Sequence, residues 1–291
     1  MRSKSSIIST IFFTLVLLVG LSVMLYPTIS NWWNEKTQSR AVASYDSAVA
    51  ELDDTRTDDM IAEANRYNEQ IAELKAPFAD YAEVPGYESI LDVSGTGIIG
   101  YITIPVIDVE LPIYHGVSDA VLNVAAGHLP GSALPIGGEN THAVISAHRG
   151  LPSAKLFSDL DQLVVGDTFT ITVLNQIYTY EIEACLIVKP HEMEKLLVIP
   201  GGDYVTLMTC TPYGVNTHRL LLRAHRIETI YQSSVKVSAD AVQVDPLLVV
   251  PLISAPLLML LLLTWSVGGR KNKLLPYRTS LYLPIEYKKG D

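Results

Sequence analysis

Two residues in the C-terminal half of the sequence, Cys210 and Arg219, combine a nucleophile with a cation. Cys210 follows a run of mostly β-branched, aromatic and apolar residues at 204–209, which favours a strand. A second run at 219–225 can pair back against the first, because the residues between them form turns. Such a hairpin would place the thiol beside the guanidinium at the end of the sheet. An adjacent cation favours the nucleophilic thiolate and can stabilise a developing oxyanion.

His148 has a similar place, at the end of an apolar, β-branched run that turn formers interrupt. Side chains at strand ends lie where loops can shape a cleft. A purely structural interpretation also remains open, because free cysteines are among the most often buried residues. The second cysteine, Cys185, lies in the strand-like segment 178–188 and is interpreted as a packing residue. A disulfide between Cys185 and Cys210 is a further alternative, and it would remove the nucleophile.

The composition limits the classes of function. The chain has 291 residues, of which 21 are basic and 31 acidic, and its two cysteines are too few for a disulfide framework. Residues 1–26 hold two basic residues, and residues 247–291 hold six basic and two acidic ones, which leaves 13 basic and 29 acidic residues at 27–246. This acidic middle region argues against nucleic acid as a partner. No cluster of His, Cys, Asp and Glu has ligand spacing, so the sequence predicts no metal site.

Two uncharged apolar segments lie near the ends of the chain, at 7–26 and 247–269. Each has about the twenty residues that cross a bilayer as a helix. Aromatic residues at the end of the first segment resemble an interfacial belt and favour an uncleaved anchor over a cleaved signal peptide. Basic residues flank each segment on the side of its chain terminus. The positive-inside rule therefore places the tails 1–6 and 270–291 in the cytoplasm and the region between the segments outside the cell membrane.

The region between the apolar segments divides into three parts. Residues 27–97 are predicted to form a helical stalk followed by a turn-rich connector, because apolar residues recur near helical spacing before Pro and Gly appear. Residues 98–232 contain seven short strand candidates, which predicts a closed or sandwiched antiparallel β domain with short helices at 118–125 and 153–160. Residues 233–246 form a linker to the second apolar segment.

Several spaced motifs resemble the sortases, the membrane-bound cysteine transpeptidases of Gram-positive bacteria. The segment that ends in the cysteine, Thr206-Leu-Met-Thr-Cys210, resembles the signature of that family, with Arg219 after it. Three further strings resemble the class C, pilus-assembling branch: Leu111-Pro-Ile-Tyr-His-Gly116, Gly127-His-Leu129 and His148-Arg-Gly-Leu-Pro-Ser-Ala-Lys-Leu-Phe157. Two membrane segments also fit that branch. The resemblance covers about residues 75–230.

The resemblance implies a mainly β fold, an eight-stranded β-barrel with short helices. It implies that Cys210 is the nucleophile, His148 the general acid and base, and Arg219 the stabiliser of the oxyanion or substrate. The implied reaction cleaves an LPXTG-like sorting signal between Thr and Gly through a thioester on Cys210. A lysine amine of a pilin subunit then resolves the thioester, which leaves an isopeptide bond and polymerises pili. No cofactor is implied, and the expected partners are pilin subunits and the cytoplasmic membrane.

The sequence departs from the class C pattern at the lid, a segment before the barrel with an Asp-Pro-aromatic tripeptide that plugs the active site. The matching place here contains Ala76, Pro77 and Phe78. The aromatic plug, Phe78, is retained, whereas the carboxylate that would pair with Arg219 is absent. Other functions remain open from the sequence: a sortase that anchors surface proteins to a peptidoglycan precursor, a membrane-bound cysteine protease, and a non-catalytic scaffold.

Overall fold

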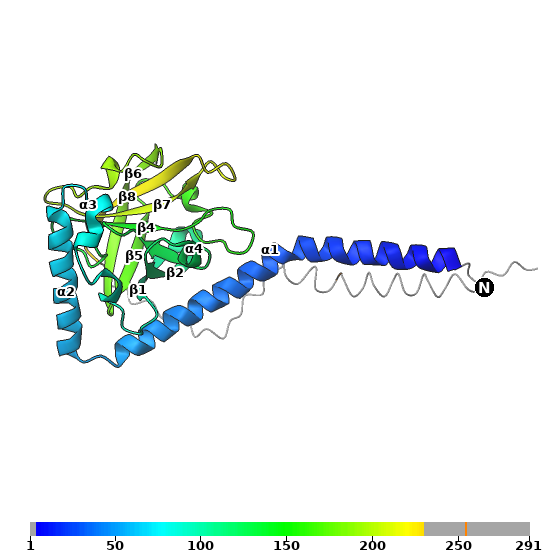
Figure 1. Ribbon diagram of the computed structural model, residues 1–291, viewed down its shortest axis with the longest axis horizontal. Helices are drawn as coiled ribbons and strands as arrows, with labels where there is room; N and C mark the ends of the chain where they lie inside the picture. The colour runs from blue at the N-terminus through cyan, green and yellow to red at the C-terminus, as the bar shows by residue number, and fades with distance from the viewer. Residues whose placement is uncertain (1–3, 230–253, 255–291) are drawn as a thin grey trace, which may run out of the picture. The chain divides into compact units, whose positions relative to one another are not determined.

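The structure, a computed structural model, describes residues 4–229 and 254. Eight strands close into one barrel in the order β1-β2-β3-β4-β7-β8-β6-β5 (Figure 1). The predicted eight-stranded barrel is confirmed, and its strands in chain order are β1 (Ile98–Ile104), β2 (Val109–His115), β3 (Ala126–His128), β4 (Thr141–Ser146), β5 (Thr168–Val173), β6 (Gln176–Val188), β7 (Asp203–Thr211) and β8 (His218–Ile227).

The barrel is mixed and not wholly antiparallel, which corrects the expectation from the strand pattern. Strand β2 runs parallel to β3, and β4 runs parallel to β7. A parallel pair needs a long crossover connection, and the chain forms β5 and β6 between β4 and β7. Strand β3 has only three residues, one of which is Gly127. It therefore lacks the alternation of apolar residues from which a strand can be predicted.

Two clusters of apolar side chains lie on opposite faces of the strands. The main core fills the barrel with alternate residues of each strand, for example Ile102, Val205, Leu207 and Leu222. A second group, called here the outer cluster, lies on the opposite face of β4, β7 and β8. Its buried members are Val144, Val188, Leu196 and Leu221, and the partly buried side chains packed against them are Phe78, Leu129, Leu186, Met193 and Met208.

Two long helices precede the barrel, α1 (Lys4–Ala50) and α2 (Asp54–Glu73). The first continues without interruption from the predicted anchor into the predicted stalk. Asp53 caps α2 by accepting the Arg56 N–H at 2.7 Å. Both helices pack on the barrel (Figure 1). The Tyr45 hydroxyl donates to the Ile99 carbonyl, and the Asn68 side-chain amide donates to the Leu134 carbonyl.

Short helices occupy the connections. They are α3 (Pro77–Asp80), α4 (Asp119–Leu122) and the 3-10 turns at Tyr81–Glu83, Tyr87–Ser89, Pro105–Ile107, Leu160–Gln162 and Glu194–Leu196. The helix expected at 118–125 is therefore present as α4. The prediction of a helix at 153–160 is wrong. This stretch folds into turns, and Leu156 lies in the left-handed region with a φ of 43°.

Several predicted segments lie outside the described residues. The linker 233–246, the second apolar segment 247–269 apart from Ser254, and the basic tail 270–291 belong to this group. The first apolar segment 7–26 lies in α1, and this helix is long and apolar enough to cross a membrane. Of the tail 1–6, residues 4–6 already belong to α1.

Candidate active site

Cys210 and Arg219 face each other across the hairpin that joins β7 to β8. The strands pair antiparallel, and their register sets Cys210 opposite Arg219. Both residues are partly buried. The connecting turn is closed by the N–H groups of Val215 and Asn216, which both donate to the Pro212 carbonyl at 3.0 Å. The predicted hairpin is confirmed, and its register pairs Cys210 with Arg219.

The guanidinium of Arg219 is held by its own turn. Its Nη1 donates to the Asn216 carbonyl at 3.3 Å and to the His218 carbonyl at 3.1 Å. These bonds fix one arm of the planar fork beside the end of β7. A guanidinium held in this way is a preorganised donor for charge that develops near Cys210.

His148 reaches the level of Cys210 through the parallel pairing of β4 with β7. Ser146 lies opposite Met208, and the pairing continues for one more residue, because the Ala147 N–H donates to the Met208 carbonyl at 3.2 Å. The Thr209 hydroxyl also donates to the Ala147 carbonyl at 2.8 Å. Continuing this register past the end of β4 aligns His148 with Cys210.

The alternation of side chains assigns the three residues to one face. In β7 and β8, Met208 and Leu221 belong to the outer cluster, so Cys210 and Arg219, two residues further toward the turn, point to the same side. In β4, Val144 belongs to the outer cluster as well, and His148 follows it by four residues. The candidate site is therefore on the outer face of the barrel, at the ends of β4, β7 and β8.

A second set of contacts joins the His148 loop to the Cys210 turn. Arg149 forms an ion pair with Asp161, and its guanidinium lies 5.7 Å from the ring centroid of Tyr213. A Cβ at Gly150 would lie 3.1 Å from the same ring, so the glycine permits this close approach. Asp161 and Tyr213 were not singled out from the sequence, since nothing in their local pattern shows that the two loops meet.

The predicted lid lies against the outer cluster. Pro77 is buried and Phe78 packs against the cluster that contains Met208, two residues before Cys210. The lid backbone is also close to Gly131, where an added Cβ would lie 2.9 Å from the Phe78 Cα. Ala76 is exposed and has no carboxylate to offer. Packing thus holds this segment in place.

Two further histidines, His128 and His142, are fully buried and hydrogen-bonded. His128 ends β3, where its ring contacts the Tyr87 hydroxyl at 2.9 Å and the Ala133 carbonyl at 2.8 Å. His142 lies in β4, and its ring nitrogens contact the Leu197 carbonyl at 2.9 Å and the Thr206 hydroxyl at 2.8 Å. Burial lowers the pKa of both rings, that of His128 to about 4.

Cys185 is exposed in β6, so its interpretation as a packing residue is wrong. Both cysteines are free. Strand β8 lies between the two, because Cys185 pairs with Leu222 of β8 while Cys210 belongs to β7 on the other side. Two strand spacings amount to about 10 Å, beyond the reach of a disulfide. The alternative of a Cys185–Cys210 bridge is thereby excluded.

Comparison with known proteins gives the family. The sortase domain family matches residues 102–227. The chain is 45% identical to a structure of sortase C1 from Streptococcus agalactiae, with a TM-score of 0.60 over 66% of this chain and 100% of that one. It is 41% identical to a structure of sortase C-1 from Streptococcus pneumoniae, with a TM-score of 0.59 over 66% of this chain and 100% of that one.

This protein belongs to the sortase family. A further relative is sortase A of Streptococcus agalactiae serotype III (strain NEM316), which is 33% identical over 135 residues. That alignment spans 45% of this sortase and 54% of the relative, so the chain matches about half the length of this curated protein. The solved structures similar to this sortase include class C enzymes of two streptococci, and they are similar over the whole length of those chains.

The described part of the sortase offers no metal centre. Within residues 4–229, no group of three or more His, Cys, Asp or Glu side chains could hold a metal ion. The functional groups that the geometry brings together are a thiol, an imidazole and a guanidinium on three adjacent strand ends. This set can carry out acyl transfer with its own side chains.

Proposed function

We propose that this sortase is a membrane-anchored cysteine transpeptidase with Cys210 as nucleophile, His148 as general acid and base, and Arg219 as oxyanion stabiliser. The placement of Cys210 opposite Arg219, with His148 at the level of Cys210, is the observation that carries the proposal. Acyl transfer from an amide needs a nucleophile, a proton donor for the leaving amine and stabilisation of the tetrahedral intermediate. In this sortase one residue is available for each of these three requirements.

The proposed first half-reaction forms a thioester. The Cys210 thiolate attacks the carbonyl carbon of the substrate threonine, and the carbonyl electron pair moves to the oxygen, which Arg219 stabilises. When the intermediate collapses, the C–N bond to glycine breaks and His148 gives its proton to the departing amine. In the second half-reaction an acceptor amine attacks the thioester and His148 takes up the amine proton. The Cys210 thiolate then leaves, which restores the starting state.

We assign the acceptor to a pilin lysine, which makes the enzyme a class C pilin polymerase acting on LPXTG-like sorting signals. Two features support this assignment. The first is the similarity to sortase C1 and C-1 structures at 45% and 41% identity. The second is the segment at Pro77 and Phe78, which packs over the outer cluster beside Cys210 as a lid would. A peptidoglycan precursor remains the alternative acceptor.

The enzyme is proposed to lie outside the cytoplasmic membrane on two spans, 7–26 and 247–269. The apolar side chains of α1 support the first span, since most of the large ones between residues 11 and 24 are exposed. The basic residues beside each segment support cytoplasmic tails. The stalk and lid would then be 27–97, the catalytic barrel 98–232 and the linker 233–246.

A comparison of the two cysteines tests the nucleophile. The full chain in detergent micelles is given a sorting-signal peptide and a lysine-containing pilin peptide, and the products are identified by mass spectrometry. We expect Cys210→Ala to lose both the thioester and the isopeptide product, because no other thiol faces Arg219. The exposed Cys185→Ala is the matched control and should keep most of the activity. An active Cys210→Ala enzyme would refute the assignment.

The same assay distinguishes the alternative functions. A transpeptidase joins the peptide to the added amine, whereas a cysteine protease releases the free acid whether or not an amine is present. If hydrolysis dominated at saturating amine, the transpeptidase proposal would fail. If a lipid-linked peptidoglycan precursor competed better than the pilin lysine, the enzyme would be a wall-anchoring sortase.

A further inference from the structure

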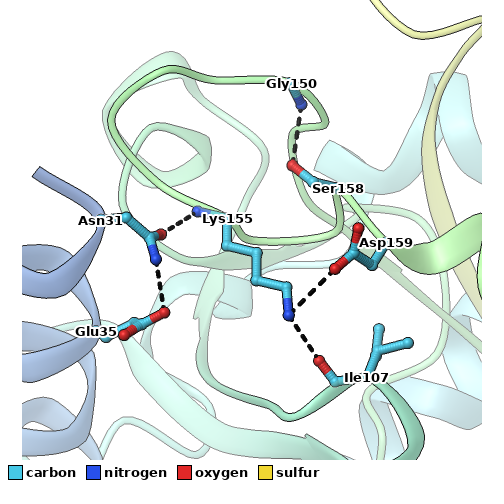
Figure 2. A network of polar contacts seen from close by, with 7 residues as sticks. All are labelled: Asn31, Glu35, Ile107, Gly150, Lys155, Ser158 and Asp159. Atoms are coloured by element: carbon cyan, nitrogen blue, oxygen red, sulfur yellow. Dashed lines mark hydrogen bonds and ion pairs between the residues drawn. The ribbon is translucent and has the colours of Figure 1, made fainter. Parts of the chain in front are cut away.

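The loop that carries His148 is tied to helix α1 by two asparagine side chains. The Lys155 N–H donates to Asn31 Oδ1 at 2.6 Å, and Asn34 Nδ2 donates to the Ser153 carbonyl at 2.7 Å. Both bonds join residues more than a hundred positions apart in the sequence. Figure 2 shows Asn31 pointing from α1 toward the Lys155 backbone.

The orientation of the Asn31 amide follows from its partners. Its Nδ2 donates to a carboxylate oxygen of Glu35 at 2.7 Å, so its Oδ1 is the atom that accepts the Lys155 N–H. The Asn34 amide must present its nitrogen to a carbonyl oxygen, which accepts only. Asn31 thus contacts the loop as an acceptor and Asn34 contacts it as a donor.

These asparagines begin the face of α1 that lies on the barrel. Residues 31, 34, 38, 42 and 45 follow each other at helical spacing. Val42 and Tyr45, further along, are buried in apolar packing, whereas Asn31, Asn34 and Gln38 contact the barrel through side-chain amides. The Gln38 amide donates to the Val124 carbonyl at 2.7 Å, outside the His148 loop.

The His148 loop is internally stiff, so a restraint on its far side reaches the histidine. The Phe157 N–H donates to the His148 carbonyl at 3.1 Å. The Gly150 N–H donates to the Ser158 hydroxyl at 3.1 Å, as Figure 2 shows. The Lys155 ammonium donates to the Ile107 carbonyl at 2.9 Å and lies 3.1 Å from an Asp159 carboxylate oxygen. These bonds connect the two ends of the loop with each other and connect the loop with the turn after β1.

We propose that Asn31 and Asn34 are positioning residues that hold His148 at the level of Cys210 from the membrane-proximal part of α1. The inference rests on the proposed role of His148. Asn31 is five residues beyond the apolar segment, or roughly 7.5 Å along a helix. The anchor helix itself therefore completes the catalytic geometry, and loss of its contacts lowers the rate of the chemical step without weakening peptide binding.

The first experiment compares matched amide truncations in the full chain reconstituted in lipid nanodiscs, with a fluorogenic LPXTG-like peptide and an amine acceptor. Because His148 becomes mobile, Asn31→Ala/Asn34→Ala is expected to lower kcat about tenfold and to change KM by less than twofold. Gln38→Ala removes a side-chain hydrogen bond between the same helix and Val124, which lies outside the His148 loop, so its kcat should stay within twofold of the wild-type value. An equal loss of kcat in both variants would refute the proposal.

The second experiment uses one substitution at both positions. Both aspartate variants are made in a Glu35→Gln background, because Glu35 accepts from the Asn31 amide and would repel a second carboxylate there. Asn31→Asp keeps an oxygen for the Lys155 N–H, so its kcat should stay near that of Glu35→Gln alone. Asn34→Asp sets a carboxylate against the Ser153 carbonyl, so its kcat should fall about as far as in the double alanine variant. Both changes add one negative charge to the same helix. Equal activities of Asn31→Asp and Asn34→Asp would overturn the inference.

Hydrogen exchange and a parallel control complete the test. Exchange of the Lys155 amide should accelerate in Asn31→Ala/Asn34→Ala and stay slow in Gln38→Ala, while the unfolding temperatures of the two variants remain similar. Unchanged Lys155 exchange would contradict the proposal. Cys210→Ala is assayed in parallel. If Cys210→Ala remains active, the proposed function is wrong. If Cys210→Ala is inactive and the asparagine variants are fully active, only the positioning role of Asn31 and Asn34 is refuted.

Discussion

At the scale of single residues, Arg219 illustrates why side-chain shape matters as much as charge. Its Nη1 is bonded to the Asn216 and His218 carbonyls, which orients the planar fork beside Cys210. A lysine carries all its donors on one nitrogen and cannot reproduce the fixed, planar geometry in which a guanidinium can contact the turn and an oxyanion through different nitrogens. The role proposed for Arg219 therefore depends on the guanidinium.

We expect Arg219→Lys to lower kcat/KM by about two orders of magnitude, as for the loss of a single oxyanion donor. Arg223→Lys provides a control in the same strand, since Arg223 pairs with Glu183 away from the thiol and its replacement should change the rate little. Steady-state kinetics with the sorting-signal peptide measure both. A near wild-type rate for Arg219→Lys would assign Arg219 a structural role.

His128 affects the stability of the fold and takes no part in the proposed chemistry. Burial lowers its pKa from 6.5 to about 4, so the folded ring stays neutral where the unfolded ring binds a proton. The unfolded state binds more protons between these two values, and the free energy of unfolding therefore falls as the pH drops through 6.5 toward 4.

Acidification from pH 7 to pH 5 should reduce the free energy of unfolding by about 2 kcal/mol through this histidine alone. His128→Gln removes the titrating group, so the variant should be less stable at pH 7 yet lose less stability on acidification. Urea titrations at the two pH values measure the difference, with the exposed His191 replaced in the same way as a control. An unchanged pH dependence in His128→Gln would contradict the assignment.

At the scale of elements, the segment α3 is the part proposed to move. Phe78 packs against the outer cluster, and the Pro77 carbonyl and Phe78 Cα lie against Gly131. No carboxylate at position 76 is available to pair with Arg219. A partly exposed ion pair contributes about 0–1 kcal/mol, so its absence changes the lid population by roughly fivefold at most. Packing is therefore expected to keep the lid closed at rest.

Labelling of the Cys210 thiol reports how often the lid opens. The rate should rise in Phe78→Ala, which loses the packing, and fall in Ala76→Asp, which gains a partner for Arg219. Gly131→Ala should also raise it, because the new Cβ would lie 2.4 Å from the Pro77 carbonyl oxygen. Gly166→Ala is the matched control, as Gly166 also has a positive φ, 97°, but no atom lies near its added Cβ. Unchanged labelling in Phe78→Ala would mean that this segment is no lid.

At the scale of the whole molecule, α1 joins the proposed anchor to the barrel as one helix, with Pro27 between the two parts. The helix runs from Lys4 to Ala50, and its later part packs on the barrel through Tyr45 and Val49. An anchor of this kind restricts the orientation of the active site relative to the bilayer. A protein that polymerises membrane-held subunits would benefit from such a restriction, because it limits the search between donor and acceptor.

Reporter fusions test the proposed topology. Green fluorescent protein fused after Asp291 should fluoresce, because both tails are expected in the cytoplasm. Alkaline phosphatase fused after residue 246, before the second apolar segment, should be active, because that point is expected outside. A chain that ends at residue 246 should still sediment with membranes through the first span. Active phosphatase fused after Asp291 would refute the two-span arrangement.

The sequence by itself determined the features that depend on neighbouring residues. Alternating β-branched and apolar residues marked seven of the eight strands, and the turn formers after Cys210 determined the hairpin that sets it opposite Arg219. Signals within about twenty residues suffice for these features, because strand periodicity and turn geometry are local properties. The motif around His148 implied a catalytic role by resemblance, and it did not predict where the histidine lies relative to Cys210.

Only the tertiary structure decided which distant segments meet. The parallel pairing of β4 with β7 brings His148 level with Cys210 across some sixty residues of sequence, and no local pattern encodes that register. The same holds for His128, which becomes buried because the three-residue β3 is inserted between β2 and β4. It also holds for Asn31 and Asn34, whose polar side chains are typical of a solvated helix until the His148 loop packs against them.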